Sequence, residues 1–188
     1  MRKKIEKLIR ESIAVKEKLL ECTEEIFTLA KRIIDVLKED GVVYLFGNGG
    51  SAADAQHIAA ELSGRFLLDR SPLPAVALTT NTSAITAIAN DYGFDSVFSR
   101  QLEGLITPKD IAIGITTSGK SPNVLRALRR AKELNASTAA LTGNFTDSIR
   151  ELCDIVVAVP SSSTPRIQEA HILIGHIICE LVEKGLFA

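Results

Sequence analysis

With 188 residues, the chain is long enough to bury a substantial core, and we expect residues 1–188 to form one domain. Its 46% hydrophobic and 24% charged residues exclude a disordered chain, a collagen-like repeat and a coiled-coil rod. Because the chain has 22 Lys and Arg and 23 Asp and Glu, its net charge gives no reason to expect nucleic-acid binding. The net charge does not exclude a local basic patch.

Residues 1–40 contain no Gly or Pro, and their apolar residues recur at helical spacing. We expect one bent helix or two helices in series, an N-terminal helical extension before the sheet. Thr23 marks a helix start and Gly41 a helix stop. The first helix either covers the core of its own chain or packs on another subunit, and the pattern does not decide between the two.

Five short runs that are apolar on both faces follow, and such runs are typical of buried parallel strands. They cover residues 42–46, 74–78, 111–115, 138–141 and 155–159. The helical stretches between and after them cover 51–63, 82–106 with a break near Tyr92 and Gly93, 121–134, 146–152 and 164–184. The alternation predicts an α/β fold, a five-stranded parallel sheet with helices on both faces and the flavodoxin-like strand order 2-1-3-4-5.

Two Gly, Ser and Thr loops follow the first and third predicted strands. They read Gly-Asn-Gly-Gly-Ser at 47–51 and Thr-Thr-Ser-Gly-Lys-Ser at 116–121, and each leads into a helix. Glycines let the backbone approach a ligand, and a helix N-terminus offers free N–H groups with a partial positive charge. Either loop alone is as readily explained by an ordinary capped strand-to-helix turn as by a ligand site. Together, at the point where strand order reverses, they predict a phosphate site.

The second loop also matches the nucleotide-binding P-loop pattern over residues 114–121. Two features speak against a P-loop. Gly114 falls inside the apolar run of the third strand, and no apolar strand ends in an Asp that would bind Mg²⁺. We therefore expect the match to be coincidental.

His57 and Glu61 stand four residues apart on one face of the helix that starts near Ser51. This spacing suits a metal site or an acid–base pair, although a solvated pair is the ordinary alternative for such a motif alone. The last helix carries His171 and His176, about 140° apart around its axis, with Gln168 within about 80° of either. Periodicity does not choose between these two histidines.

Cys22, Cys153 and Cys179 are odd in number and form no Cys-x-x-Cys pair. A disulfide framework and a thiolate zinc site are therefore not expected, and a reducing compartment is favoured. No apolar stretch resembles a secretory signal or is long enough to span a membrane. We expect a cytoplasmic protein with no membrane partner.

Several of these segments together closely resemble the bacterial phosphoheptose isomerases, a family of SIS (sugar isomerase) domain proteins. They are GNGGSAADAQHIAAEL (47–62), GR (64–65), ITAIANDYGFDSVFSRQLEGL (85–105), TTSGKS (116–121), LTGN (141–144) and RIQEAHILIGHIICELVE (166–183). The resemblance covers nearly the whole chain and implies a single SIS domain. It also implies interconversion of sedoheptulose 7-phosphate and D-glycero-D-manno-heptose 7-phosphate, the first step toward nucleotide-activated heptose.

The resemblance assigns roles to residues that match the family's motifs. It implies that Glu61 is the catalytic base and His176 the catalytic acid. It implies zinc held by His57, Glu61, Gln168 and His176. The implied substrate-binding residues are Asn48, Gly49, Gly50, Ser51, Glu61, Arg65, Asn90, Asp91, Thr116, Thr117, Ser118, Ser121 and Gln168. The family also implies a homotetramer with active sites where subunits meet.

Two departures and one distance qualify this assignment. Family members commonly have Asn where Lys120 stands and Ser where Thr116 stands, and both exchanges keep the loop polar. Gln168 and His176 are separated by about 12 Å along a continuous helix, so they share one metal only if their side chains lean together or the helix starts near Gln168. The alternative function is a non-catalytic SIS protein that binds a sugar phosphate or a replication-initiator partner. The SIS protein that binds a replication initiator lacks counterparts of Glu61 and His176, and both residues are present in this chain.

Overall fold

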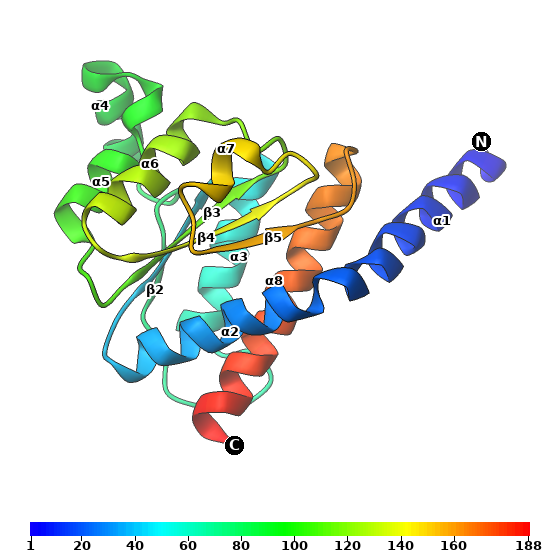
Figure 1. Ribbon diagram of the computed structural model, residues 1–188, viewed down its shortest axis with the longest axis horizontal. Helices are drawn as coiled ribbons and strands as arrows, with labels where there is room; N and C mark the ends of the chain where they lie inside the picture. Colours follow the sequence, from blue (N-terminus) through cyan, green and yellow to red (C-terminus); the bar gives the residue numbers. More distant parts are fainter.

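The computed structural model describes residues 1–188 and contains one parallel five-stranded sheet with the order β2-β1-β3-β4-β5 (Figure 1). The strands are β1 (Val43–Gly47), β2 (Ala75–Ala77), β3 (Ile111–Thr116), β4 (Ser137–Thr142) and β5 (Ile155–Ala158). All paired strands run parallel, with Val43 opposite Ala75 on one side and Ile111 on the other. The predicted fold class and strand order are confirmed.

Helices cover both faces of the sheet. They are α1 (Arg2–Lys18), α2 (Thr23–Lys38), α3 (Gly50–Ser63), α4 (Thr82–Tyr92), α5 (Ser99–Leu105), α6 (Pro122–Glu133), α7 (Asp147–Arg150) and α8 (Thr164–Phe187), with 3₁₀ turns at Leu19–Cys22 and Phe94–Ser96. One apolar core joins α2, α3 and α8 to the sheet, and the second joins α5, α6 and α7 to its other face. The break predicted near Tyr92 and Gly93 occurs at Gly93, where φ is +83°.

The N-terminal region forms two helices in series, joined by the 3₁₀ turn. Helix α2 begins at Thr23 as predicted, but no side chain caps it, and the Thr23 hydroxyl donates backwards to the carbonyl of Leu20 (2.8 Å). At its end Asp40, not Gly41, takes the left-handed conformation (φ 59°), and the Gly41 N–H closes the turn on Val36 O (2.9 Å). Gly41 is required for space instead, because a Cβ there would collide with the carbonyl of Lys109.

Helix α1 projects from the body of the molecule and buries none of its residues (Figure 1). Ile5, Ile9 and Ile13 are each at least half exposed along it. Arg166 of α8 ties its middle to the domain by donating to the carbonyl of Leu8 (2.7 Å). Within one chain, α1 therefore has an apolar stripe that no other element covers.

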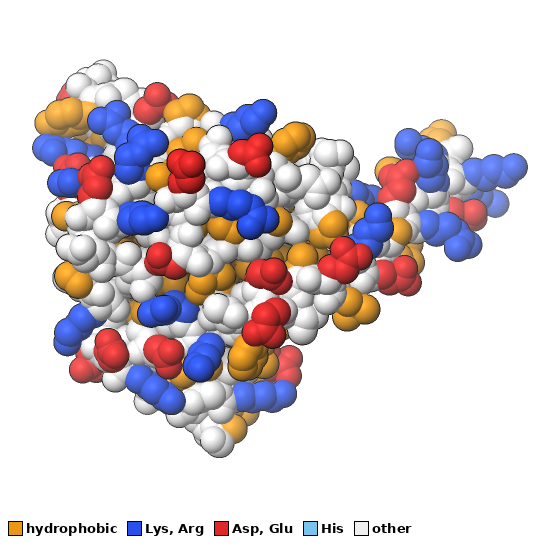
Figure 2. Space-filling view, in the orientation of Figure 1, with side chains coloured by type: hydrophobic (Ala, Val, Ile, Leu, Met, Phe, Trp, Pro, Cys, Tyr) orange, Lys and Arg blue, Asp and Glu red, His pale blue; other side chains and the backbone are white.

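Charges of both signs are mixed over the face shown in Figure 2, with apolar side chains between them. None of the helices combines the length and the hydropathy that a membrane span requires.

Candidate active site

Two strand-to-helix loops border a cavity of about 300 Å³ at the carboxyl ends of β1 and β3. Here the strand order reverses, which is where open α/β sheets bind ligands. The first turns of α8 form the third side of the cavity. The lining residues are Asn48, Gly49, Gly50, Ser51, Ile115, Thr116, Thr117, Ser121, Thr164 and Gln168. The structure thus brings the two predicted loops together with Gln168.

Glycines and a pair of amides shape the first loop. Gly49 takes φ +57°, a conformation that glycine adopts without strain. A Cβ at Gly50 would collide with the side chain of Gln168, so glycine lets α8 approach closely. Asn48 exchanges two hydrogen bonds of 2.9 Å with the buried Asn123, which ties the two loops together. Asn123 was not predicted as part of the site, although its place in the first turn of the helix after the second loop was an available signal.

The second loop gathers hydroxyl groups at the start of α6. Thr116 Oγ1 lies 3.0 Å from Ser121 Oγ and 3.5 Å from Ser118 Oγ. Ser121 is the N-cap of α6, so the positive end of the helix faces these hydroxyls. Gly119 is left-handed (φ 63°), and a Cβ there would collide with the carbonyl of Phe145. Such a set of donors suits an anion.

The P-loop match has a packing explanation. Gly114 lies in the middle of β3, where a Cβ would come within 2.8 Å of Val124 Cγ1 of α6. Lys120 is exposed and does not line the cavity; its Nζ lies over the ring of Phe145, 5.2 Å from the centroid. A P-loop lysine reaches the phosphates of its nucleotide. The expectation that the match is coincidental is therefore supported by the geometry.

His57, Glu61 and His176 form one cluster, although α3 and α8 lie far apart in sequence. His57 Nε2 is 3.1 Å from Glu61 Oε1 and 3.1 Å from His176 Nε2. The ring of Phe66 stacks on His176 with centroids 5.6 Å apart. One ligand atom from each of the three residues falls within 4.8 Å of the others, so together they can hold a metal ion. Two imidazoles and one carboxylate are a ligand set typical of zinc.

His171 has a different environment, and the structure thereby separates the two histidines of α8. It is fully buried, and its Nε2 lies 3.2 Å from the carbonyl oxygen of Thr142. Burial lowers the pKa of His171 to about 4, although the Thr142 carbonyl acts in the opposite direction. His171 is therefore neutral and faces the core, whereas His176 faces His57.

The depressed pKa of His171 predicts a loss of stability in acid. An unfolded histidine takes a proton near pH 6.5, whereas folded His171 takes one only near pH 4. As pH falls through this window, its contribution to the free energy of unfolding declines by about 3 kcal/mol. Urea unfolding at several pH values should show this decline. His171→Gln, which keeps a neutral polar group, should show a shallower one, and equal pH slopes in both proteins would contradict the assignment.

Gln168 does not stand beside the histidine cluster along the helix. Helix α8 is continuous from Thr164, so the alternative that it starts near Gln168 does not apply. Gln168 packs on Gly50 at the cavity, about 12 Å along the axis from His176. Its predicted role in substrate binding matches this position more directly than its predicted role as a metal ligand, which stays a prediction.

Ser118 belongs to the second loop but is exposed and does not line the cavity. Three further predicted substrate residues lie away from both the cavity and the loops. Asn90 and Asp91 are exposed on α4, a helix that extends away from the sheet (Figure 1). The Asn90 amide donates to Asp91 at 2.8 Å. Arg65 is exposed in the loop after α3. A single chain therefore does not gather these residues around the two loops.

Asp54 is a half-buried carboxyl group that was not predicted as part of the site. It precedes His57 by one helical turn on α3, and its Oδ2 is buried without a hydrogen-bond partner. Burial raises the pKa of Asp54 to about 6, against the opposing effect of His57. Its spacing from His57 and Glu61, which places all three on one stripe of the helix, was the available signal.

Comparison with known proteins agrees with this geometry. A family model described as SIS domain matches residues 8–143. The phosphoheptose isomerase of Aquifex aeolicus is 53% identical over 185 residues, which span 98% of this chain and 97% of that protein. The solved phosphoheptose isomerase of Neisseria gonorrhoeae is 42% identical with a TM-score of 0.92, covering 97% of this chain and 98% of that one. That of Francisella tularensis is 36% identical with a TM-score of 0.93, covering 97% of each. The chain therefore belongs to the phosphoheptose isomerase family of SIS-domain proteins.

Proposed function

We propose that the chain is an aldose–ketose isomerase that interconverts sedoheptulose 7-phosphate and D-glycero-D-manno-heptose 7-phosphate. The observation that carries the proposal is the convergence of Glu61 and His176 on His57, in a chain about half identical to phosphoheptose isomerases over its full length. The product is the starting compound for nucleotide-activated heptose. A purely binding SIS protein would have no need for this acid–base cluster.

The reaction moves a proton between adjacent carbons through an enediol. Glu61 takes the carbon-bound proton next to the carbonyl group, and His176 gives a proton to the carbonyl oxygen. The enediol then collapses: Glu61 returns its proton to the neighbouring carbon, and the hydroxyl on the first carbon gives its proton to His176 as the new carbonyl group forms. Both side chains thereby regain their starting protonation states, and no net proton is gained or lost. A carboxylate and an imidazole suit these roles near neutral pH.

The cavity between the two loops holds the phosphate end of the substrate in this proposal. The hydroxyls of Thr116 and Ser121 and the start of α6 supply donors for the phosphate oxygens. The Ser118 hydroxyl, 3.5 Å from Thr116 Oγ1, stands beside them and adds a further donor. The first loop and Gln168 contact the sugar chain from the opposite side of the cavity. Anchoring the far end of the substrate orients its reacting carbons toward Glu61.

We also propose that the cluster binds zinc through His57, Glu61 and His176, with Gln168 completing the set if its side chain leans toward them. The approach of the three ligand atoms within 4.8 Å supports this. A bound zinc ion would polarise the carbonyl group of the substrate or hold the site's geometry.

A homotetramer with active sites at subunit interfaces completes the proposal. The exposed apolar stripe of α1 offers a surface for a second copy. Arg65, Asn90 and Asp91 are exposed and outside the cavity of their own chain, as expected of residues that serve a neighbouring subunit's site.

The three cysteines are all unpaired, which supports action in the cytoplasm.

Incubating the purified protein with sedoheptulose 7-phosphate and following the aldose product by NMR tests this function directly. We expect the signals of the heptose 7-phosphate to appear and to reach the same ratio from either direction. Binding of the ketose phosphate with no aldose formed would instead favour the non-catalytic alternative.

Lys120→Asn is expected to leave isomerisation within a few-fold of the parent protein. Lys120 lies over Phe145 and outside the cavity, so its charge is not needed to hold phosphate. Steady-state kinetics measure the effect. Ser121→Ala serves as the contrasting variant: it removes a hydroxyl of the cavity and should chiefly raise KM, because a phosphate contact is made equally in ground and transition states.

Calorimetry with Mg²⁺–ATP checks the same loop independently. No binding is expected in either protein. Tight nucleotide binding that Lys120→Asn abolishes would restore the P-loop interpretation and overturn the assignment of this loop to a sugar phosphate.

A further inference from the structure

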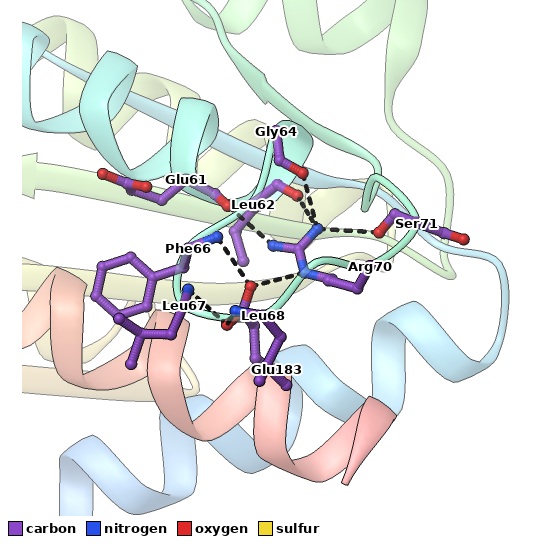
Figure 3. Close-up of polar contacts among 9 residues, drawn as sticks. All are labelled: Glu61, Leu62, Gly64, Phe66, Leu67, Leu68, Arg70, Ser71 and Glu183. Atoms are coloured by element: carbon purple, nitrogen blue, oxygen red, sulfur yellow. Dashed lines mark hydrogen bonds and ion pairs between the residues drawn. The ribbon is translucent and has the colours of Figure 1, made fainter.

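Glu183 is a buried carboxylate of α8 that the proposed reaction does not use. Its side chain is 1% exposed. Its Oε1 accepts from the backbone N–H of Phe66 (2.9 Å), and its Oε2 accepts from those of Leu67 (2.9 Å) and Leu68 (3.0 Å) (Figure 3). Burial by itself raises the pKa of Glu183, but these N–H groups and Arg70 outweigh burial and lower it below its usual value. An ionised carboxylate thus holds three consecutive amides of the loop after α3.

Arg70 is the partner of Glu183 and binds the end of α3. Its side chain is 2% exposed, and its Nε donates to Glu183 Oε1 at 2.8 Å. Its remaining N–H groups donate to the carbonyls of Glu61 (2.9 Å), Leu62 (2.8 Å), Gly64 (3.2 Å) and Ser71 (3.0 Å). The last carbonyls of a helix have no partner within it, so Arg70 caps α3 at the turn that bears Glu61 (Figure 3).

The ion pair therefore connects both ends of the acid–base cluster. Arg70 holds the backbone of Glu61, while Glu183 holds the N–H of Phe66, whose ring stacks on His176. We propose that Arg70 and Glu183 are positioning residues, which fix the loop 64–70 so that Glu61 and His176 keep the separation that proton transfer requires. The kinetic part of this proposal rests on the proposed function.

A role in stability alone does not account for this arrangement. A buried ion pair is often replaceable by apolar residues of similar size without loss of stability. What Arg70 and Glu183 supply is direction, because each donor and acceptor meets a specific backbone group of one loop. The phosphate cavity lies at the opposite ends of α3 and α8, beside Gly50 and Gln168. Loss of the Arg70–Glu183 ion pair should therefore affect the chemical step more than substrate binding.

Two variants and one control test the proposal by kinetics. Glu183→Gln loosens the loop, and Phe66→Leu removes only the ring on His176 and leaves the ion pair in place. The control is Glu180→Gln, which removes an exposed α8 carboxylate paired with Lys184 (2.7 Å). We expect kcat to fall about 10–100-fold in both variants with KM within about threefold, because small misplacements of reacting groups are costly. The control should match the parent protein.

A spectroscopic measurement gives an answer without catalysis. The chain has 3 histidines, so the imidazole proton signals of ¹³C-labelled protein can be assigned by substitution. The ring current of Phe66 displaces the His176 signals, and Phe66→Leu calibrates that displacement. We expect Glu183→Gln to lose most of it while His171 keeps its signals.

The outcomes separate the possibilities. If Glu183→Gln lowers the melting temperature but keeps kcat and the His176 signals, the Arg70–Glu183 ion pair only stabilises the fold, and the proposal is overturned. If Glu183→Gln fails to fold, Phe66→Leu decides, and normal kcat in that variant overturns the proposal. If the parent protein forms no aldose, the proposed function fails, while the His176 signals still decide the positioning role.

Discussion

Replacing Glu61 by Gln is expected to lower turnover by about 10²–10⁴-fold, the usual contribution of a general base. The amide keeps the size of the side chain and its place beside His57, where the carboxylate now stands at 3.1 Å. It does not take a proton from carbon at neutral pH. The phosphate cavity lies toward the other end of α3, so binding of inorganic phosphate should persist. Single-turnover kinetics and phosphate calorimetry measure the two properties.

Glu61→Asp is the matched control for this experiment. It retains the carboxylate but withdraws it by one methylene, so an intermediate rate is expected. Near-normal turnover in Glu61→Gln would remove Glu61 from the role of base. A loss of phosphate binding in that variant would show instead that the substitution disturbs the whole site.

The sheet could be predicted closely because buried parallel strands are apolar on both faces. The run 111–115 became β3 (Ile111–Thr116), and the other four strands also lie within about a residue or two of their predicted ends. The conformation of the turns between elements was harder to predict from the sequence. Gly41 was predicted to mark the stop of α2, but Asp40 adopts the left-handed conformation there. The glycine is explained by space instead, because a Cβ at Gly41 would collide with the carbonyl of Lys109.

The two loops of the site were also readable from sequence, because glycines and hydroxyls at strand ends carry a local signal. The choice between His171 and His176 was not, since it depends on which face of α8 meets α3. Gly175 decides that face: a Cβ there would come 2.6 Å from Ile58 Cγ1, so its absence lets the helices pack closely. This contact brings His176 against His57 and turns His171 into the core.

Polar pairs between residues far apart in the sequence could not be predicted either, because they also depend on which elements meet in the folded chain. Arg70 and Glu183 are 113 positions apart, and neither belongs to a motif with fixed spacing. Both are charged residues that ordinarily remain in water. Only the folded chain shows that they are buried together and hold the loop beside the acid–base cluster.

The contrast between the two histidines of α8 yields the second large effect. His176→Ala is expected to abolish isomerisation, with a loss of at least about 10²-fold, because it removes the proposed acid. It also removes one of the three atoms that can hold a metal, so zinc affinity should fall with it. His171→Gln should keep turnover within a few-fold, since His171 is buried against Thr142 and does not face the cluster.

His171→Gln should instead reveal itself in stability. It disturbs a buried hydrogen bond, which is expected to cost about 1–3 kcal/mol in the free energy of unfolding. His176 is not enclosed by the core, so His176→Ala should unfold at nearly the parent urea concentration. Activity and urea unfolding, measured on both variants, therefore give opposite patterns. Equal losses of activity with both folds intact by circular dichroism would mean that the assignment of His176, and with it the proposed acid, is wrong.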